Sequence, residues 1–471
     1  MGPIPKLKLG FVPAHRGIFS GALARQMRTE TLAALGEAGI EVVVPDEAMT
    51  KLGCVQDRTE AEKCAALFRA QDVAGIVIGA MTFGDEQAAA WVVRQARLDV
   101  PILVFGCQED RALAPGAPRR DSFCGLLSIA EALRQIGARY SVGRQPICFP
   151  RDPAFQADAV TFAAVCRVVR GIRQARYGQI GARPDGFWTC RFDEKKLQRL
   201  GPTTVVLDLS EALAGANRLR DDDPGVLATV EAIRAYADTS AVAEASVIKM
   251  ARFEVFLTRW GRENAIDAFA IQCWTSIQNN FGICACTTMS RLGDLGLPAA
   301  CEADILGTLS MHACQLASGR PAALADWNNL HNDDDQLVNL WHCGVFPKSL
   351  ADAQPRLAVH EIIASSGAAR PEDAEGVVES RLRPSPVTLA RVTQDADGSW
   401  KALVVEGAIE ENTARTGGSQ GWCRVANLPR LYRDVLLRHF PHHVALTPTH
   451  VAPALREAFG RYLDFQVFAN D

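Results

Sequence analysis

The chain has 471 residues, which is too long for one compact core, and its length predicts two to four domains. Hydrophobic residues make up 48% and charged residues 22% of the chain, as in an ordinary globular protein. The formal net charge of −4 excludes the strongly basic surface of a nucleic-acid-binding protein, so we expect no nucleic-acid partner.

The sequence also gives no indication of targeting to a membrane or for secretion. The sequence shows no signal-peptide pattern, and no apolar run approaches the ~20 residues that span a bilayer. The 14 cysteines include no CxxC pair, which argues against a zinc ribbon or a thioredoxin-type site. Several lie inside apolar runs, as is typical of a reducing compartment. We therefore expect a soluble cytoplasmic protein with no membrane partner.

The first part of the chain alternates continuously apolar strands with amphipathic helices. This alternation predicts a doubly wound, Rossmann-like parallel sheet over residues 1–150. The expected strands are 7–13, 40–45, 73–80, 101–106 and 146–150, and the expected helices are 19–38, 59–70, 86–97 and 124–137.

A second alternation predicts another α/β domain over residues 151–352, which carries Glu302 and Asp326. From residue 353 the composition becomes β-rich, and the "DADGS" turn between two apolar runs in 384–411 predicts a hairpin. The expected fold class is α/β, with two doubly wound parallel-sheet domains followed by a smaller β-rich C-terminal domain, 353–471. In the second domain we expect strands at 203–210, at 265–274 and just before each acid, and helices at 153–179, 225–239, 242–262, 285–294 and 303–318.

The glycine signatures of nucleotide binding are absent from these α/β domains. No G-x-G-x-x-G or G-x-x-x-x-G-K-[ST] motif follows a strand, and no G-x-S-x-G nucleophile elbow occurs. The sequence therefore argues against dinucleotide or nucleotide binding by the usual glycine turns.

Two carboxylates follow buried-looking runs, Glu302 in "PAACEADILG" (298–307) and Asp326 in "PAALADWNNL" (321–330). Ligands gather outside the carboxyl ends of strands in open parallel sheets, and we expect both acids there. Two neighbouring acids disfavour each other's charged form, so a divalent cation is the simplest common partner. Either acid alone also fits a helix N-cap or an ion pair, and that alternative stays open.

Histidines are available to complete such a site. His342 ends the apolar run "LVNLWH" after Asp326, and His442 and His443 form the pair in "FPHHVAL", with His450 close behind. Each of them alone also fits a hydrogen-bonded core or a cap. On an extended segment His442 and His443 point to opposite faces, so we expect at most one of the two at the site.

The run "CEADILGTLSMHACQLASGRPAALADWNNL" and the tail "HVALTPTHVAPAL" (443–455) resemble the L-fucose isomerase family, loosely over the whole chain. His342 resembles the arrangement in the related L-arabinose isomerases. The resemblance implies an ion of the Mn²⁺, Co²⁺ or Mg²⁺ type held by Glu302, Asp326 and His443, with His342 as a candidate fourth ligand. It also implies aldose–ketose isomerisation through an enediolate, with Glu302 and Asp326 as the catalytic proton-transfer groups in an unassigned order.

Further residues are candidates for contact with the sugar. The loop after the first strand carries a basic pair, although a surface turn explains it equally well. The end of the 265–274 strand carries an amide and an indole, and Met81 stands where the family has a large aromatic residue. The candidate substrate-binding residues are Arg16, His15, Met81, Gln272, Trp274, Arg415 and Trp422.

Three functions follow from these patterns. The leading one is isomerisation of a free neutral sugar of the L-fucose, L-arabinose or D-arabinose class. The alternative keeps the chemistry but acts on an acidic sugar such as a sulfonated hexose, for which His15, Arg16 and Arg415 offer cationic groups. A third is a non-catalytic sugar-binding or regulatory protein. The resemblance also implies a closed homo-oligomer, a hexamer or smaller.

Overall fold

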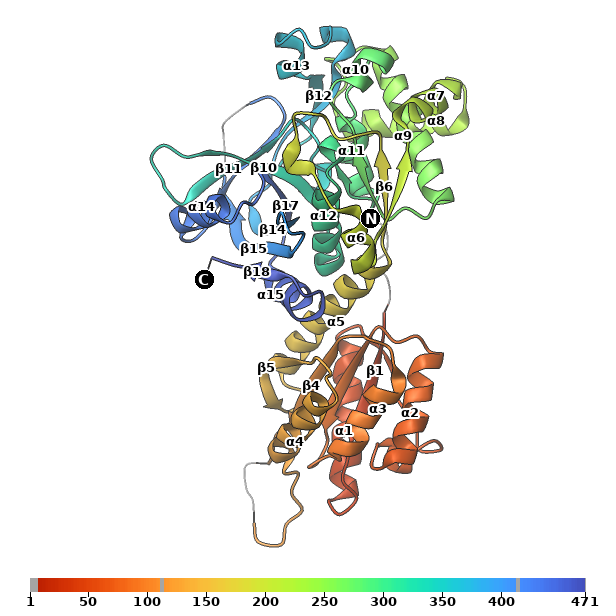
Figure 1. Cartoon of the computed structure of the whole chain (residues 1–471), viewed down its shortest axis with the longest axis vertical. Coiled ribbons are helices and arrows are strands. Elements are labelled where there is room, and N and C mark those ends of the chain that lie inside the picture. Colours follow the sequence, from red (N-terminus) through yellow and green to blue (C-terminus); the bar gives the residue numbers. More distant parts are fainter. Residues whose placement is uncertain (1–6, 111–113, 412–415, 471) are drawn as a thin grey trace. The chain divides into compact units, whose positions relative to one another are not determined.

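The computed structural model describes residues 7–110, 114–411 and 416–470 (Figure 1). The chain forms two compact units. The N-terminal unit runs to Arg170 and also includes Arg456–Leu463, and the C-terminal unit comprises Gly171–Leu455 and the residues from Asp464 on. Arg415, a candidate substrate contact, lies outside the described residues.

The N-terminal unit contains a five-stranded, fully parallel sheet in the order β2-β1-β3-β4-β5 (Figure 1). The strands are β1 (Lys8–Ala14), β2 (Glu41–Val43), β3 (Gly75–Ala80), β4 (Ile102–Cys107) and β5 (Ser141–Cys148). The helices are α1 (Gly21–Glu37), α2 (Arg58–Ala70), α3 (Glu86–Ala96), α4 (Ser122–Gln135) and α5 (Pro153–Gln174).

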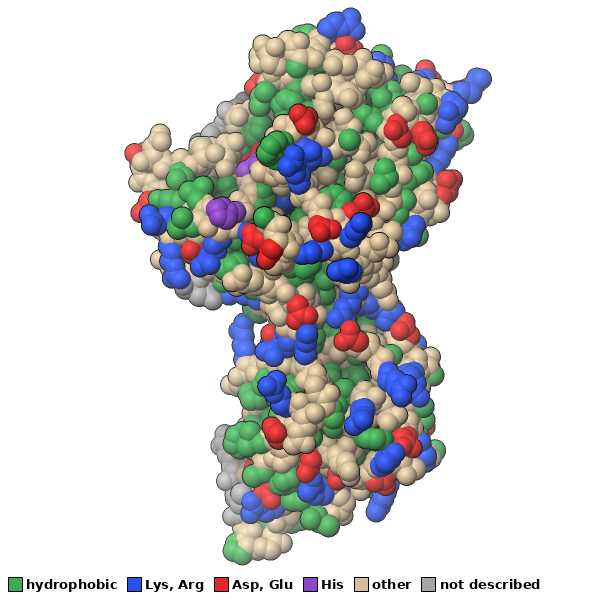
Figure 2. All heavy atoms as spheres, in the orientation of Figure 1, with side chains coloured by type: hydrophobic (Ala, Val, Ile, Leu, Met, Phe, Trp, Pro, Cys, Tyr) green, Lys and Arg blue, Asp and Glu red, His purple; other side chains and the backbone are tan. Residues whose placement is uncertain are grey.

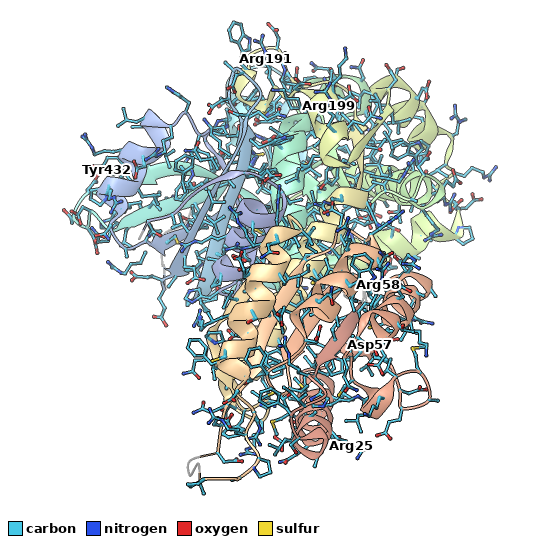
Figure 3. The ribbon with its side chains drawn as sticks, turned by 60° about the horizontal axis from the view of Figure 1, so that its bottom comes forward. Arg25, Asp57, Arg58, Arg191, Arg199 and Tyr432 are labelled. Atoms are coloured by element: carbon cyan, nitrogen blue, oxygen red, sulfur yellow. The ribbon has the colours of Figure 1, made fainter. Side chains whose placement is uncertain are left out.

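Helices cover both faces of this sheet. Alternate residues of β1 enter two different cores, since Phe11 packs with Met27 of α1 whereas Val12 packs with Cys64 of α2. The outer faces of the same helices are polar, and Arg25 of α1 and Arg58 of α2 lie on the outside (Figure 3). Burial on both faces explains why these strands read as continuously apolar.

The C-terminal unit begins with a four-stranded parallel sheet in the order β7-β6-β8-β9. Its strands are β6 (Arg176–Ile180), β7 (Thr203–Leu207), β8 (Ala268–Ile271) and β9 (Ala299–Ala300). The helices of this region are α6 (Glu194–Leu200), α7 (Leu209–Arg218), α8 (Pro224–Tyr236), α9 (Glu244–Glu263), α10 (Ser276–Phe281), α11 (Cys286–Asp294) and α12 (Ile305–Ser318).

A nine-stranded mixed sheet follows in the order β12-β13-β16-β11-β10-β17-β14-β15-β18. A further pairing of β15 with β16 closes six of these strands into a circuit, so the sheet curves back on itself. The strands are β10 (Ala323–Leu330), β11 (Leu337–His342), β12 (Arg356–Val359), β13 (Glu375–Arg381), β14 (Ser385–Gln394), β15 (Trp400–Ile409), β16 (Ser419–Arg424), β17 (His443–Thr447) and β18 (Gln466–Phe468), with helices α13 (Glu361–Ser365), α14 (Leu428–Leu437) and α15 (Ala452–Glu457).

The expected α/β class is confirmed, with two parallel sheets and a larger mixed sheet, and the hairpin at "DADGS" is β14–β15. One expectation is wrong. The strand that carries Asp326 does not belong to the parallel sheet, because β10 pairs antiparallel with β11 and β17. A short apolar run reads the same in both kinds of sheet, and only its partners differ.

The surface matches the modest net charge. Figure 2 shows acidic and basic side chains interspersed over the face in view. Among the helices that the structure describes, none combines the length and the apolar character needed to cross a bilayer.

The packing of α4 on the loop after β3 makes a testable stability prediction. A Cβ added at Gly125 of α4 would stand 1.4 Å from the carbonyl oxygen of Phe83, whereas one added at Gly36 of α1 would meet nothing within 4 Å. Gly125→Ala should lower the free energy of unfolding by about 3 kcal/mol or more, because the helix must move away. Gly36→Ala, the matched control, should raise it by about 0.5–1 kcal/mol. Chemical denaturation measures both, and equal effects would contradict the packing.

Candidate active site

Glu302 lies in a tight turn just beyond the carboxyl end of the parallel sheet. It follows β9 within the 3₁₀ turn Cys301–Ala303, and its side chain is buried. Glu302 and Ala303 both take left-handed conformations, with φ of 61° and 53°. Such backbone strain costs of order 1–3 kcal/mol per residue and clusters at functional sites. The expected place of Glu302 at a strand end is thus confirmed.

The mixed sheet brings Asp326 and His443 together. They are direct partners across the antiparallel strands β10 and β17, so their side chains share one face. His342 is the last residue of β11, next to Trp341, which faces Asp326 from the other side. Asp326 therefore lies inside a strand and not at the end of one, which corrects the sequence expectation.

These elements place two carboxylates around one imidazole. Nε2 of His443 lies 3.4 Å from Oε2 of Glu302 and 3.6 Å from Oδ1 of Asp326. Ligands at ~2.1 Å from one octahedral ion are about 3 Å apart when they are neighbours, so small shifts suffice for all three to share a cation. Glu302 and His443 are almost fully buried, whereas the side chain of Asp326 is 18% exposed. The site therefore opens to solvent on the Asp326 side.

Three atoms at this point have no hydrogen-bond partner within the described part of the chain. They are Oδ1 of Asp326, Nε2 of His443 and Nε2 of His342, and all are buried. Buried polar atoms are nearly always paired, so their convergence fits a group that the protein itself does not supply. Oxygen and imidazole donors suit a hard or borderline divalent cation. The residues present therefore fit a metal of this class.

The electrostatics agree with that fit. Burial raises the pKa of Glu302 to about 8, and the neighbouring acids Asp326 and Asp304 add to the rise, against the opposing charge of His342. Burial also raises the pKa of Asp326. Two carboxyl groups that ionise reluctantly side by side gain most from a cation between them.

Asp304 is a site residue that the sequence reasoning missed. Nδ1–H of His443 donates to Oδ2 of Asp304 over 2.8 Å, which leaves the lone pair of Nε2 facing Glu302 and Asp326. Arg391 of β14 donates to both oxygens of Asp304, over 2.5 and 3.2 Å. Burial alone would raise the pKa of Asp304, but Arg391 and the bond from His443 hold it well below its usual range.

A signal for Asp304 exists in the sequence, although it is weak. Asp304 stands two residues after Glu302 and caps α12, accepting the backbone N–H of Gly307 over 2.8 Å. The N-cap alternative that was left open for Glu302 thus applies to Asp304 instead. The sequence around Arg391 resembles that of any apolar strand, so nothing in it predicts that Arg391 pairs with Asp304.

His442 departs from expectation. Its ring centroid is 4.3 Å from that of His443, and its Nε2 is 3.7 Å from Oδ1 of Asp326. The expected opposite orientation is wrong because β17 begins at His443, so the alternation of a strand does not extend back to residue 442. His450 hydrogen-bonds the carbonyl of Gly407 and is exposed.

Two of the candidate sugar contacts lie in the parallel sheet's loops. Oε1 of Gln272 accepts the backbone N–H of Ala182, and its Nε2 donates to Ser276. The ring of Phe187 lies between Trp274 and the site. Its centroid is 6.2 Å from the ring centroid of Trp274 and 6.5 Å from that of His442.

The other candidates are placed elsewhere. Trp422 of β16 contacts the ring of His331. In the N-terminal unit, buried His15 hydrogen-bonds Thr82, and Met81 is fully buried. Arg16 pairs with Glu86, donates to the carbonyl of Gly84 and lies 4.6 Å from the ring of Phe83.

Comparison with known proteins adds to this geometry. Residues 10–173 match the family model described as fucose/sulfoquinovose isomerase, N-terminal domain, and residues 340–470 match the one for the L-fucose isomerase C-terminal domain. A sulfoquinovose isomerase from Priestia aryabhattai is 24% identical over 463 residues, 97% of each chain. One from Alkalicoccus urumqiensis is 27% identical over 398 residues, 83% of this chain and 85% of the relative.

Solved structures add nothing further. An ABC transporter solute binding protein from Agrobacterium vitis is 12% identical, covering 66% of this chain and 90% of that chain with a TM-score of 0.17. A score this low carries no argument.

The fold and the buried acid–imidazole site, with isomerase domains matched at both ends, define an enzyme that isomerises sugars. The chain belongs to the fucose isomerase-like family of aldose–ketose isomerases. The resemblance seen in the sequence is confirmed, and the alternative of a non-catalytic binding protein is set aside.

The Asp304–His443 bond makes a testable prediction. In Asp304→Asn the neutral amide no longer neutralises the charge of buried Arg391. It also accepts a weaker hydrogen bond from His443, so the imidazole is less firmly oriented. Affinity for divalent metal should fall about 10–100-fold. The free energy of unfolding should also fall by about 3–5 kcal/mol, because a buried charge loses its partner.

Glu254→Gln is the matched control. Glu254 forms a buried ion pair with Arg291 that belongs to helices α9 and α11 and not to this site. It should lose stability but keep its metal affinity, as measured by calorimetric titration. Equal metal affinities in the two variants would show that Asp304 is structural only.

Proposed function

We propose that the chain interconverts sulfoquinovose, or a closely similar acidic sulfonated aldose, and its 2-ketose. The observation that carries this proposal is full-length similarity to sulfoquinovose isomerases, which extends over 97% of both chains. The match of residues 10–173 to a fucose/sulfoquinovose isomerase domain supports the same substrate class. The alternative drawn from the sequence is therefore favoured over the leading expectation of a neutral sugar.

Glu302, Asp326 and His443 are the proposed ligands of a divalent cation, with Mn²⁺ as the first candidate and Co²⁺ or Mg²⁺ as substitutes. Their donor set of two carboxylates and one imidazole supports this choice. When bound, such a cation polarises the sugar carbonyl and stabilises negative charge on the neighbouring oxygens.

The chain's own carboxylates carry the protons in this proposal. One of the pair Glu302 and Asp326 removes the proton from the carbon beside the carbonyl and returns it to the other carbon, while its partner handles the hydroxyl proton. Oε2 of Glu302 and Oδ1 of Asp326 lie 3.4 and 3.6 Å from Nε2 of His443, so a sugar bound at this point meets both carboxylates. The buried side of the site, at Glu302 and His443, excludes water from the exchange.

An acidic sugar also needs a cationic partner for its sulfonate. Arg16 is the proposed cationic group, and it would exchange its pairing with Glu86 for the substrate. Burial lowers the pKa of His15, so His15 is proposed to contact the substrate as a neutral imidazole. The closed homo-oligomer and the cytoplasmic location expected from the sequence stay part of this proposal. They are supported by the family resemblance and by the buried free cysteines, respectively.

Substrate choice is testable directly. We expect kcat/KM for sulfoquinovose to exceed that for L-fucose by about 100-fold or more, because a site built for a polar group rejects an analogue that lacks it. Arg16→Ala should reduce this ratio, whereas Arg25→Ala, an exposed arginine of the same unit that pairs with Glu47, should leave it unchanged. Equal turnover of both sugars by the wild type would refute the acidic substrate.

The ligand role of His443 is tested by metal content. His443→Ala should lower divalent-metal affinity by about 100-fold or more, beyond the 10–100-fold typical of a residue that only supports a ligand, and should remove isomerase activity. His450→Ala is the control, because His450 is an exposed histidine of the same segment. Metal analysis and circular dichroism give readouts independent of turnover. Full metal content in folded His443→Ala would disprove the assignment.

A further inference from the structure

His442 stands at the opening of the candidate site. Its side chain is 40% exposed, against 18% for Asp326 and 1% for His443, so exposure rises from His443 through Asp326 to His442. Nε2 of His442 lies 3.7 Å from Oδ1 of Asp326, which is too far for a good hydrogen bond. The imidazole of His442 is therefore close to the reacting groups without being bonded to them.

Packing between rings holds the imidazole of His442 in place. Its ring centroid lies 4.3 Å from that of His443 and 6.5 Å from that of Phe187, with tilts of 49° and 44° between the planes. Phe187 in turn packs against Trp274. Among the residues that the structure describes, none forms a hydrogen bond with either ring nitrogen of His442. Both nitrogens are therefore free to bind a ligand.

The surroundings of His442 differ from those of a metal ligand. Donor atoms of Asp326, His442 and His443 all lie within 4.8 Å of one another, so distance alone does not separate the two histidines. A histidine that binds a metal through one nitrogen almost always donates its other N–H to a protein acceptor. His443 does so, because its Nδ1–H donates to Asp304. His442 has no such acceptor, so its position suits contact with the substrate better than contact with the ion.

The space between His442 and Asp326 suits a hydroxyl group. A carboxylate only accepts hydrogen bonds, and the imidazole nitrogen that faces it carries the proton, since two lone pairs would repel each other. A hydroxyl both donates and accepts, and one oxygen can lie ~2.8 Å from each of two atoms that are 3.7 Å apart. A carboxylate has about four lone-pair sites, so Asp326 can serve a cation and a hydroxyl together.

We propose that His442 is a substrate-binding residue that recognises the hydroxyl on carbon 3 of the open-chain sugar. The inference rests on the proposed reaction at carbons 1 and 2 beside Glu302 and Asp326. Carbon 3 carries the first hydroxyl that the reaction does not use, and the chain continues from there toward the open side of the site. This hydroxyl donates to Asp326 and accepts the Nε2–H of His442.

The test compares one substrate with its 3-deoxy analogue. The substrate is the aldose that the wild type turns over best, so the test does not depend on which sugar that is. We expect kcat/KM of the wild type to be about 100-fold lower for the analogue, because both partners of the missing hydroxyl are left unpaired. A wild type that turns over both sugars equally overturns the proposal without any variant.

The variant His442→Ala assigns the discrimination to this residue. It should lower kcat/KM for the substrate about 5- to 10-fold, mainly through a higher KM. The analogue makes no bond to His442 and loses nothing, so the ratio between the two sugars should shrink by the same factor. His442→Gln keeps an N–H donor at similar reach and should restore most of the ratio. The same loss in His442→Gln would show that only the packing of the ring matters, and would refute the hydrogen bond.

Metal binding by the same variants separates this inference from the proposed site. His442→Ala should keep its divalent-metal affinity within about twofold, as should the exposed control His450→Ala, which should also keep the wild-type ratio. Circular dichroism checks that each variant is folded. A loss of metal as large as in His443→Ala would make His442 a ligand and overturn the inference.

The two proposals fail in different ways. Full metal content in folded His443→Ala would contradict the proposed metal site itself. If His443→Ala loses the metal as expected, but His442→Ala still discriminates against the 3-deoxy sugar as the wild type does, the site stands and only the role of His442 is refuted.

Discussion

The structure of the site depends on one buried carboxylate. Asp304 begins α12, which packs against the parallel sheet, and it accepts bonds from Arg391 of β14 and His443 of β17 in the mixed sheet. A buried carboxylate without partners would be costly, so the two sheets must approach in the one way that satisfies all three groups. The same bond fixes which nitrogen of His443 faces Glu302 and Asp326.

Two further carboxyl groups near Asp304, those of Glu302 and Asp326, have no arginine or lysine partner among the described residues. Arg391 pairs with Asp304, so the groups around Glu302 and Asp326 are each other and the neighbouring histidines. The strained turn at Glu302 holds its carboxylate where it could not relax toward solvent. This arrangement lowers the stability of the folded protein, but it suits the binding of a cation and the stabilisation of an anionic intermediate.

Buried free cysteines pack beneath the same turn. Cys301 immediately precedes Glu302, and its Sγ lies 2.9 Å from Sγ of Cys273. Free cysteine behaves as a small hydrophobic residue, so these side chains form a closely packed core under the turn that carries Glu302.

The sequence by itself determined the α/β alternation, the hairpin at β14–β15 and the pair of acids, because hydrophobic period and turn residues are local properties. With the family resemblance it also led to His443. It could not place Asp326 in the mixed sheet, join Arg391 to Asp304, bring His442 close or gather the cysteines, since strand partners and side-chain convergence join residues far apart in the chain. Only the tertiary structure decided these, because long-range pairing is set by which buried polar groups satisfy one another.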